Sequence, residues 1–260
     1  MKKLKILFLI PFFVVNIISS ASNIESTTTT SSTIGLKYLQ NVDTRIKTKI
    51  SANKLNYYYD LFGREKYEYF PLQLGNGEYF ITIFKNIIDN KYRVVESNRI
   101  KEIKNNILEV FRSSVQNINW NKDMDVIKKA TELTKGKKND KEKITVIYNY
   151  IIKNFNYDYE KINKITSDYV PNIETIYSEK KGICYDYASI FASMCRSQKI
   201  PVKLIKGYTK NVKEYHAWNE VYVDKKWQVI DTTFDSVYIK AGHKVKMFKD
   251  AKLYKASAEY

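Results

Sequence analysis

The stretch Gly182-Ile183-Cys184-Tyr185-Asp186-Tyr187-Ala188 begins the part of the sequence that decides the fold. Four residues from here on recur at i, i+4, i+7 and i+11, namely Cys184, Ala188, Phe191 and Cys195. This spacing places them on one face of a helix, which we expect to end before Ile200-Pro201 because proline disfavours helix in the residue before it. Three extended runs follow, over residues 202–208, 215–223 and 227–233. A helix followed by an antiparallel meander predicts an α+β fold rather than a doubly wound sheet.

Cys184 stands at the N-terminal end of the expected helix, just after Gly182. The unpaired N–H groups and the dipole of the helix favour an anion there, by roughly 0.3–1 kcal/mol for an exposed group. Lys180 and Lys181 act in the same direction, whereas Asp186 opposes them and helps to cap the first turn. This environment favours the thiolate form of Cys184, which is the nucleophilic form.

The second cysteine, Cys195, lies eleven residues further along the same helix face. At ~1.5 Å per residue the two Cα atoms would be roughly 16 Å apart, and a disulfide needs less than ~7 Å. An intrachain disulfide and a shared zinc site are therefore both excluded, and we expect two free thiols. Cys195 lacks the setting of Cys184 and is predicted to be a small core residue.

His216 is the expected base, because the other histidine, His243, falls in a loop-like segment that predicts a surface imidazole. A tight turn at Asp224-Lys225 would make Asp231 the diagonal neighbour of His216 on one face of the strand pair. Their Cα atoms would be roughly 7–8 Å apart, a distance that the two side chains span. Asp231 would hold the imidazole in the tautomer that accepts the Cys184 proton, and the backbone N–H of Cys184 would donate to an oxyanion.

Three motifs carry a resemblance to the transglutaminase-like superfamily. They are residues 182–188, His216-Ala217-Trp218-Asn219-Glu220-Val221, and Trp227 through Asp231-Thr232-Thr233-Phe234-Asp235, with Thr232 where the superfamily usually has proline. Gly207-Tyr208 also fits, and the similarity extends over about residues 120–250. The resemblance implies a papain-like, transglutaminase-core fold in which Cys184, His216 and Asp231 form the catalytic triad. No residue matches the superfamily's side-chain oxyanion donor.

The resemblance implies thiol-dependent acyl transfer on protein or peptide amides through a cysteine thioester, as in transamidation or deamidation of glutamine. A papain-like cysteine peptidase or amidase uses the same residues, and a non-catalytic binding module at the cell surface is the third alternative. We expect substrate contacts from Tyr185, Tyr215 and Trp218, and Tyr157 and Tyr159 are further tyrosines near the site; structural packing is the alternative role of the tyrosines. The chemistry requires no cofactor, and the sequence predicts no metal site.

The first 35 residues are predicted to precede the folded parts of the chain. Three lysines at positions 2, 3 and 5, an apolar run to Ile18 and then Ser19-Ser20-Ala21 indicate a signal peptide over residues 1–21. The apolar run is about 13 residues, short of the ~20 that span a bilayer; an uncleaved anchor is the alternative. Residues 22–35, which include the Ser/Thr run from Ser26 to Thr33, are predicted to be a flexible linker.

A β-rich N-terminal module that ends in a helix is predicted over residues 36–118, and the transglutaminase-like catalytic domain over residues 119–260. Residues 67–74 and 78–84 flank Gly75-Asn76-Gly77 as a hairpin, and residues 92–96 add a third strand. Apolar residues at helical spacing predict three helices, over residues 100–111, 124–136 and 144–155. Asn139 and Glu142 approximate a capping box for the last of these helices.

The formal net charge of +16 favours anionic partners. Removal of residues 1–21 takes away three lysines and no acid, which leaves +13. We therefore expect a secreted or cell-surface protein that anionic cell-wall polymers retain, with no stable membrane span after cleavage. Nucleic-acid binding is not expected, because no compact basic cluster is interleaved with aromatic residues.

Overall fold

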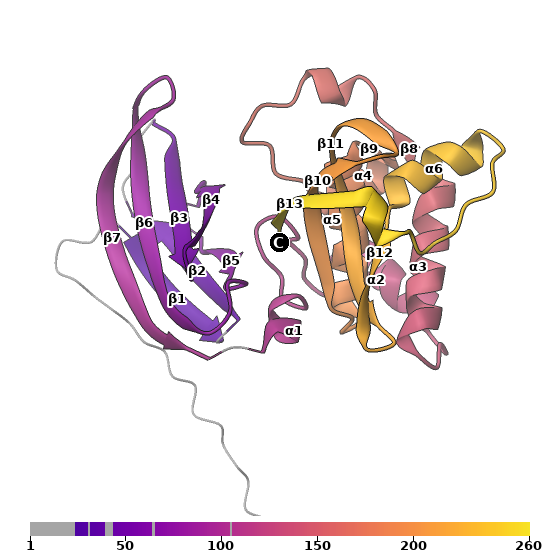
Figure 1. The fold of residues 1–260 in the computed structure, drawn as a ribbon, viewed down its shortest axis with the longest axis horizontal. Helices are drawn as coiled ribbons and strands as arrows, with labels where there is room; N and C mark the ends of the chain where they lie inside the picture. The colour runs from indigo at the N-terminus through magenta and orange to yellow at the C-terminus, as the bar shows by residue number, and fades with distance from the viewer. Residues whose placement is uncertain (1–23, 31, 40–43, 64–65, 105) are drawn as a thin grey trace, which may run out of the picture.

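The computed structural model describes residues 24–30, 32–39, 44–63, 66–104 and 106–260. Within these residues the chain forms an N-terminal β module and a C-terminal domain of helices and strands (Figure 1). The predicted signal peptide over residues 1–21 lies outside the described residues. The fold class is α+β, as the sequence predicts.

The N-terminal module consists of two antiparallel sheets. One sheet has the strand order β1 (Ile24–Thr30), β2 (Thr33–Tyr38) and β5 (Glu68–Pro71). The other has the order β4 (Leu55–Asp60), β3 (Ile46–Ala52), β6 (Gly77–Ile88) and β7 (Lys91–Ile103). Apolar side chains of both sheets form one core, among them Leu36, Ile50, Phe70 and Tyr79. Burial alternates along β3, as expected for a strand with one solvent-facing side.

The predicted linker is wrong for most of its length, because Ile24–Thr30 and Thr33–Tyr38 pair as β1 and β2. Flexible linkers owe their freedom to glycine and serine, whereas four of the residues in this run, 27–30, are threonine. Threonine is β-branched and favours the extended backbone of a strand. Ile24 anchors the start of β1 in the module core.

The hairpin predicted around Gly75-Asn76-Gly77 is also wrong. β5 pairs with β2, whereas β6 pairs with β3 and β7, so the glycine turn carries the chain from one sheet to the other. Gly75 and Gly77 have φ angles of 85° and 124°, which glycine adopts without a steric penalty. The Tyr79 hydroxyl donates to the carbonyls of Leu72 and Gly75, both at 2.8 Å, and holds this crossing in place. Turn residues indicate that the chain reverses but not which strands become partners.

The third predicted strand is present and is longer than residues 92–96, since β7 runs from Lys91 to Ile103. The helix predicted over residues 100–111 is therefore wrong in its first part. Ile100 and Ile103 pair with Tyr79 and Gly77 of β6, and only α1 (Ile107–Val110) is helical. Apolar residues with helical spacing entered the ladder here because a neighbouring strand was available to pair with them.

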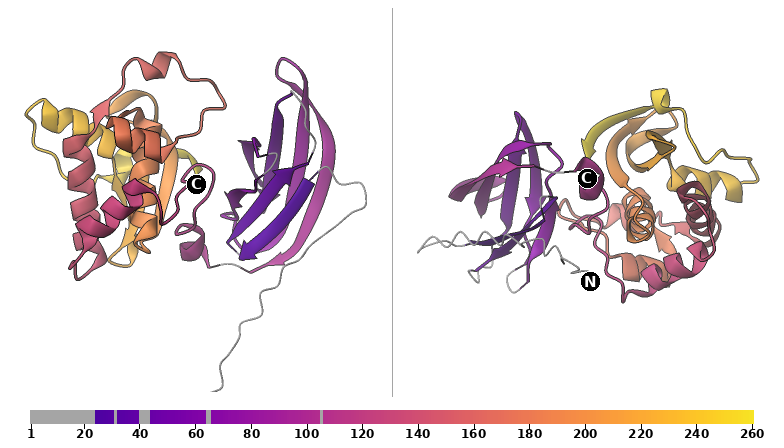
Figure 2. Two further views of the ribbon diagram at one scale, coloured as in Figure 1. Left: turned by 180° about the vertical axis from the view of Figure 1, so that it is seen from behind. Right: turned by 90° about the horizontal axis from the view of Figure 1, so that it is seen from below.

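The C-terminal domain is built around α5 (Cys184–Ser197), which ends before Ile200-Pro201 as predicted. One side of α5 packs on the antiparallel sheet β12 (Lys226–Ile230), β11 (Val212–Val223), β10 (Val202–Thr209) and β13 (Tyr254–Glu259). The helices that contact α5 are α2 (Asp125–Thr134), α3 (Asp140–Asn154), α4 (Ile173–Glu179) and α6 (Thr232–Lys240) (Figure 2). A short parallel pair, β8 (Asn156–Tyr157) with β9 (Lys181–Gly182), precedes α5. The short helix η1 (Lys161–Asn163) follows β8, and η2 (Ala251–Leu253) precedes β13.

The predicted helices over residues 124–136 and 144–155 correspond to α2 and α3. The Asn139 side chain accepts a hydrogen bond from the Glu142 N–H at 2.9 Å, which confirms the predicted N-terminal cap of α3. The predicted strand over residues 227–233 ends earlier, at Ile230, because Asp231 caps α6 instead of continuing β12.

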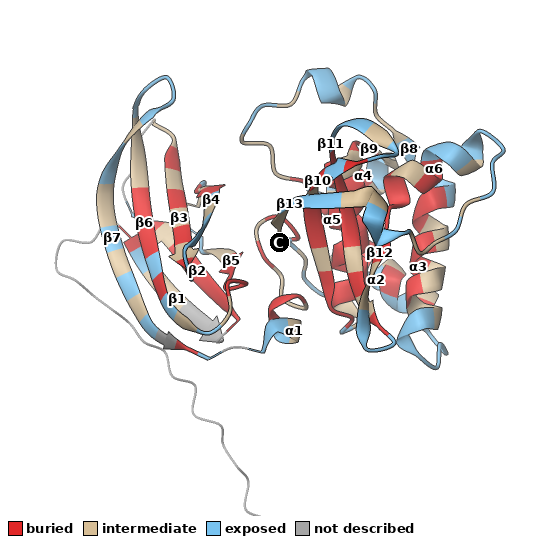
Figure 3. Ribbon diagram, viewed as in Figure 1, coloured by how far each residue is buried: buried red, intermediate tan, exposed pale blue. Residues whose placement is uncertain are grey.

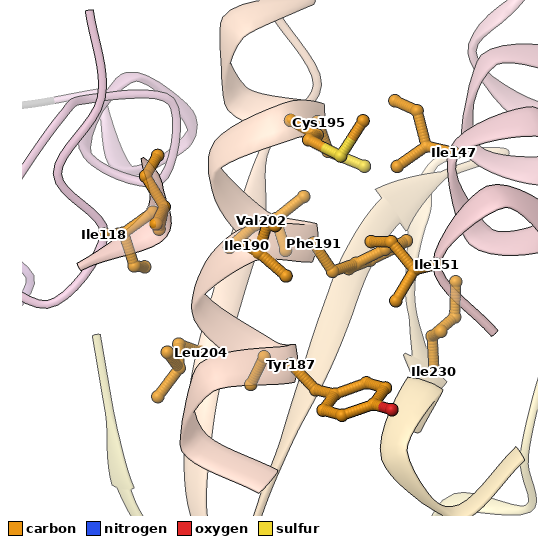
Figure 4. Packing of buried hydrophobic residues seen from close by; sticks show 14 of the residues in the cluster. Ile118, Ile147, Ile151, Tyr187, Ile190, Phe191, Cys195, Val202, Leu204 and Ile230 are labelled. Atoms are coloured by element: carbon orange, nitrogen blue, oxygen red, sulfur yellow. The ribbon is translucent and has the colours of Figure 1, made fainter. Parts of the chain in front are cut away.

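Buried residues concentrate along α5 and the strands beneath it (Figure 3). Tyr187, Ile190 and Phe191 of α5 lie among side chains from α3 and the sheet (Figure 4). Cys195 lies next to Ile147 in the same cluster and is fully buried, and this burial raises the pKa of its thiol. Cys195 is therefore a core residue, as predicted, and both cysteines are free thiols.

The module and the domain share a contact region in which the final strand takes part. The Tyr260 ring packs edge-on against Tyr57 and Tyr59, with centroids 5.6 and 5.9 Å apart. The Gln116 side chain donates to the Asp60 carbonyl and to Glu68, both at 2.6 Å. Among the residues described, no helix is long and apolar enough to cross a membrane.

Candidate active site

Cys184 is the first residue of α5 and is half-buried. Asp186, two residues on, fixes the start of this helix, since its fully buried carboxylate accepts the Ile183 N–H at 2.9 Å. Lys161 also donates to Asp186 at 2.6 Å, and Tyr169 donates its hydroxyl to the second oxygen. These donors satisfy a carboxylate that would otherwise be costly to bury. Asp186 therefore has a structural role beside Cys184, in agreement with its predicted capping role.

Gly182 is required by the same arrangement. A Cβ atom at this position would lie 2.6 Å from Cβ of Asp186, closer than two such atoms approach. The chain must pass this tightly because β9 delivers Cys184 directly from a strand pair into the first turn of the helix.

His216 and Asp231 are brought together by the turn between β11 and β12. Asp224 and Lys225 adopt φ angles of 54° and 61°, and the pairs from Val223↔Lys226 to Asn219↔Ile230 follow the register predicted from the sequence. Nε2 of His216 lies 2.9 Å from Oδ2 of Asp231. Both side chains are buried, so this contact is shielded from solvent.

The two oxygens of Asp231 have different partners. Oδ2 contacts His216 and accepts the Tyr254 hydroxyl at 3.1 Å, whereas Oδ1 accepts the Phe234 N–H at 3.0 Å as the N-cap of α6. The imidazole is also supported by Trp218, whose ring stacks on it with centroids 6.4 Å apart at an angle of 21°. The carboxylate and the indole together fix the position of the ring.

The electrostatics of His216 are set by its neighbours. Burial lowers the pKa of the imidazole, but the Asp231 charge, the hydrogen bond with Asp231 and the interaction with Cys184 raise it, with a net result of about 10. Because Nε2 is held by Asp231, the ring nitrogen available to Cys184 is Nδ1. An imidazolium in this position lies between two groups that can each carry a negative charge.

The cation near Cys184 is Lys206 of β10, which the sequence did not indicate. Burial lowers the pKa of Lys206 to about 8, and the charge of Cys184 acts in the opposite direction. The Lys206 ammonium lies 3.5 Å from the centre of the Tyr185 ring. The two lysines that the sequence predicted to act on Cys184 have other partners. The Lys180 ammonium lies 3.2 Å from the centre of the Tyr177 ring, and Lys181 forms an ion pair with Asp158 at 3.1 Å.

A cavity of ≈ 530 Å³ opens over Cys184 and His216. Its other lining residues come from the segment around β8, from the β10–β11 connection and from α6: Tyr157, Tyr159, Ile162, Asn211, Val212, Lys213, Glu214, Tyr215, Thr233, Phe234, Val237 and Tyr238. A cavity of ≈ 320 Å³ near Gln116 and one of ≈ 460 Å³ near Pro201 contain neither cysteine nor histidine in their linings. The chemistry-bearing residues thus share one cavity.

The three predicted substrate contacts have different outcomes. Tyr215 lines the cavity and is half exposed. Tyr185 and Trp218 do not line it, and they are only 8% and 1% exposed. Their side chains are committed to the Lys206 ammonium and to the His216 ring, so the predicted substrate contacts do not fit these two residues.

Tyr157 is one of the tyrosines that the sequence places near the site, either lining a substrate groove or packing in the structure. It lines the cavity with Cys184. Burial raises the pKa of Tyr157 to about 12, and the charge of nearby Cys184 contributes to this increase. Its hydroxyl is thereby kept protonated as a hydrogen-bond donor. No group of three or more His, Cys, Asp or Glu residues that could hold a metal ion occurs in the described ranges.

Comparison with protein families finds a similarity over the part of the chain that holds the site. Residues 127–232 match the model of the transglutaminase-like superfamily, and this range contains Cys184, His216 and Asp231. This part of the chain is therefore similar to the transglutaminase-like superfamily, in agreement with the resemblance of its motifs.

Relatives in curated collections share only part of their length with this chain. A UPF0252 protein of Methanocaldococcus jannaschii is 31% identical over 135 residues, which are 47% of this chain and 38% of that protein. The Kyphoscoliosis peptidase of Mus musculus is 26% identical over 117 residues, which are 41% of this chain and 18% of that protein. The chain thus spans less than half the length of either relative. A solved structure of a candidate cysteine protease from Cytophaga hutchinsonii aligns with a TM-score of 0.44 at 15% identity, covering 78% of this chain and 74% of that one.

Proposed function

We propose that the protein is a cysteine-dependent acyl transferase that acts on protein or peptide amides. Cys184 is the nucleophile, and His216 is the general base and acid. Asp231 orients the imidazole and stabilises its protonated form. One observation carries the proposal: a half-buried thiol at the start of a helix shares a cavity with an imidazole whose Nε2 is 2.9 Å from a buried carboxylate. This arrangement supplies a nucleophile, a base and an orienting group.

The first half-reaction follows from these positions. The Cys184 thiolate attacks the amide carbonyl, so that a C–S bond forms and the carbonyl electron pair moves to oxygen. When the tetrahedral intermediate collapses, the C–N bond breaks and the leaving ammonia or amine takes the His216 proton. The product is a thioester on Cys184. In the second half-reaction an amine or water attacks the thioester carbonyl and gives a proton to His216. The C–S bond then breaks, which releases the acyl product and regenerates the Cys184 thiolate beside the protonated imidazole.

The oxyanion needs hydrogen-bond donors, and two groups are available. The Cys184 N–H lies in the first turn of α5, where N–H groups have no acceptor within the helix. The Tyr157 hydroxyl, in the same cavity, is the side-chain donor that we propose. Each such donor contributes about 10²–10³ in rate where it has been removed from other enzymes.

Transamidation or deamidation of glutamine is the outcome that we favour for the thioester, following the class of the domain. A papain-like cysteine peptidase or amidase is the second candidate, because the name of a relative, the Kyphoscoliosis peptidase, states peptidase activity. The same residues serve both outcomes, which differ in whether an amine or water reaches the thioester.

The test uses a casein-like substrate with a labelled primary amine and mass spectrometry. The protein is compared with Cys184→Ala and with Cys195→Ala, which keeps the reactive thiol and removes the buried one. Amine incorporation that only Cys184→Ala abolishes supports transamidation, a one-dalton increase supports deamidation, and new chain termini support proteolysis. Identical results for the protein and Cys184→Ala would refute the enzymatic proposal and favour a binding module.

We also propose that the protein is exported and held by anionic cell-wall polymers, on the basis of the N-terminal pattern and the charge of +16. Release from cell walls should increase with salt concentration, because salt screens attraction between exposed charges. Equal release at low and high salt would contradict retention by charge.

A further inference from the structure

Exposed apolar side chains in the C-terminal domain gather at one place. Between residues 112 and 260, the large apolar side chains that are exposed are Tyr159, Ile162, Tyr208, Tyr215, Val237 and Tyr238. All of them except Tyr208 line the cavity over Cys184, and the Tyr208 ring packs against Tyr215 with centroids 5.3 Å apart. Single exposed apolar residues are ordinary, but a contiguous group marks a binding surface.

The rings of this surface form three pairs, which come from four elements of the fold. Tyr157 and Tyr159 contact each other edge-on at 4.8 Å near β8, and Phe234 and Tyr238 stack at 4.0 Å on α6. The Tyr208–Tyr215 pair is supplied by β10 and β11. β8, β9 and α6 lie together at one end of the domain, where α5 begins (Figure 1). The reactive thiol is therefore reached through an aromatic surface whose rings already hold one another in place.

The composition of the cavity favours a hydrocarbon group as its occupant. Ile162, Val212 and Val237 add branched aliphatic side chains to the aromatic rings of the lining. Besides His216, the basic and acidic side chains of the lining are Lys213 and Glu214, of opposite sign, so the lining has no cluster of like charges around the rings. Pockets with this character bind apolar groups and use few polar atoms for orientation.

We infer that the acyl donor carries a large apolar or aromatic group close to its reactive amide, and that Phe234 and Tyr238 of α6 are specificity-determining residues for it. This inference rests on the proposed function of Cys184 and names the substrate class of that site. The apolar group of the substrate contacts the rings of Phe234 and Tyr238 while its reactive carbonyl lies at Cys184. An apolar pocket discriminates between substrates that differ by one methylene group by roughly 10–200-fold in kcat/KM. A substrate with a whole ring should therefore be clearly preferred over one without it.

The experiment compares two alkylating probes with the same reactive group, iodoacetamide and N-benzyl iodoacetamide. In both, the thiolate displaces iodide as the C–S bond forms and the C–I bond breaks. Rates are followed by intact mass at low probe concentration in the Cys195→Ala protein, which has a single thiol. The benzyl-to-plain rate ratio is divided by the same ratio for glutathione, which removes any intrinsic difference between the probes.

We expect the normalised ratio to be at least about tenfold above one, and to fall toward one in Phe234→Ala and in Tyr238→Ala. The matched control is Tyr58→Ala, because Tyr58 is an exposed tyrosine on β4 of the other module. This control should leave both rates unchanged. Thermal unfolding of each variant checks that it is folded, and because the two rings stack on each other both α6 variants should show the same direction of change.

The outcomes separate this inference from the proposed function. If Cys184 reacts with plain iodoacetamide faster than glutathione but the normalised ratio is one, the apolar specificity is refuted and the nucleophile remains. If Cys184 reacts with both probes no faster than glutathione, the proposed function fails and the inference with it. If an iodoacetamide derivative of glucosamine gains as much as the benzyl probe, a saccharide-binding surface replaces the apolar one.

Discussion

Replacement of Asp231 by asparagine tests the link between the buried carboxylate and the imidazole. Asparagine has the same shape and is as good an N-cap as aspartate, so the start of α6 is preserved while the charge is removed. The pKa of His216 is raised from 6.5 to about 10, although burial alone would lower it. At roughly 1.4 kcal/mol for each pKa unit, this difference corresponds to about 5 kcal/mol of differential stabilisation of the imidazolium.

The sign of the pH dependence follows from the raised pKa. Below about pH 6.5 the imidazole is protonated in both the folded and the unfolded chain, so the pair contributes its full stabilisation. This stabilisation is lost as the pH rises from 6.5 through about 10, where the folded imidazole deprotonates. Asp231 is the larger of the two groups that raise this pKa, and Cys184 is the other. Asp231→Asn should therefore lower the free energy of unfolding by a few kcal/mol at pH 6, and the difference from the unmodified protein should narrow toward pH 10.

Two measurements check this prediction. Urea unfolding at pH 6, 8 and 10 gives the difference in stability between the two proteins. The control is Asp224→Asn, which also removes one negative charge but from an exposed turn residue. NMR titration measures the pKa of the His216 imidazole directly. The chain has only two histidines, so the variant His243→Asn assigns their signals. A His216 signal that titrates near 6.5 in the unmodified protein, or a stability difference that does not change with pH, would refute the reasoning.

Three further predictions concern the surroundings of Cys184. Tyr157→Phe removes the proposed oxyanion donor and should lower kcat by about 10²–10³ with little change in KM; an unchanged kcat in steady-state kinetics would remove Tyr157 from this role. Gly182→Ala forces its Cβ against Asp186 and should cost about 1–3 kcal/mol of stability in urea unfolding, whereas Gly136→Ala, where a Cβ meets nothing within 4 Å but φ is 77°, reports backbone strain alone; equal losses would show that the Asp186 contact is unimportant. Asp186→Asn leaves Lys161 without its buried partner and should cost about 3–5 kcal/mol; thermal unfolding that is no lower than that of the exposed-pair variant Asp125→Asn would contradict this expectation.

Local sequence signals predicted the centre of the domain because its geometry is local. A two-residue turn fixes strand register, so Asp224-Lys225 was enough to place Asp231 beside His216. The spacing of apolar residues likewise gave α5, and with it the exposed end that carries Cys184 and the buried end that carries Cys195.

Features that depend on partners distant in the sequence were missed for a physical reason. The pairing of β5 with β2 instead of β6 is decided by the two-sheet core and not by the glycine turn. Lys206 lies on a strand and is 22 residues from Cys184 in the sequence. No local sequence pattern predicts that its charge acts on Cys184. Phe234 and Tyr238 lie on α6, and the sequence predicted a strand over the first residues of this helix. Their position at the cavity therefore could not be predicted.

The bifurcated role of Asp231 links selectivity and rate. One oxygen of this carboxylate holds the imidazole and the other holds the N-terminus of α6, the helix that presents Phe234 and Tyr238. A displacement of α6 by a bulky ligand is therefore transmitted to the proton-transfer group through a single side chain. For the proposed acyl transfer, substitutions that reshape the α6 surface should therefore change turnover as well as specificity. Directed evolution of this protein toward new substrates would have to optimise both properties together.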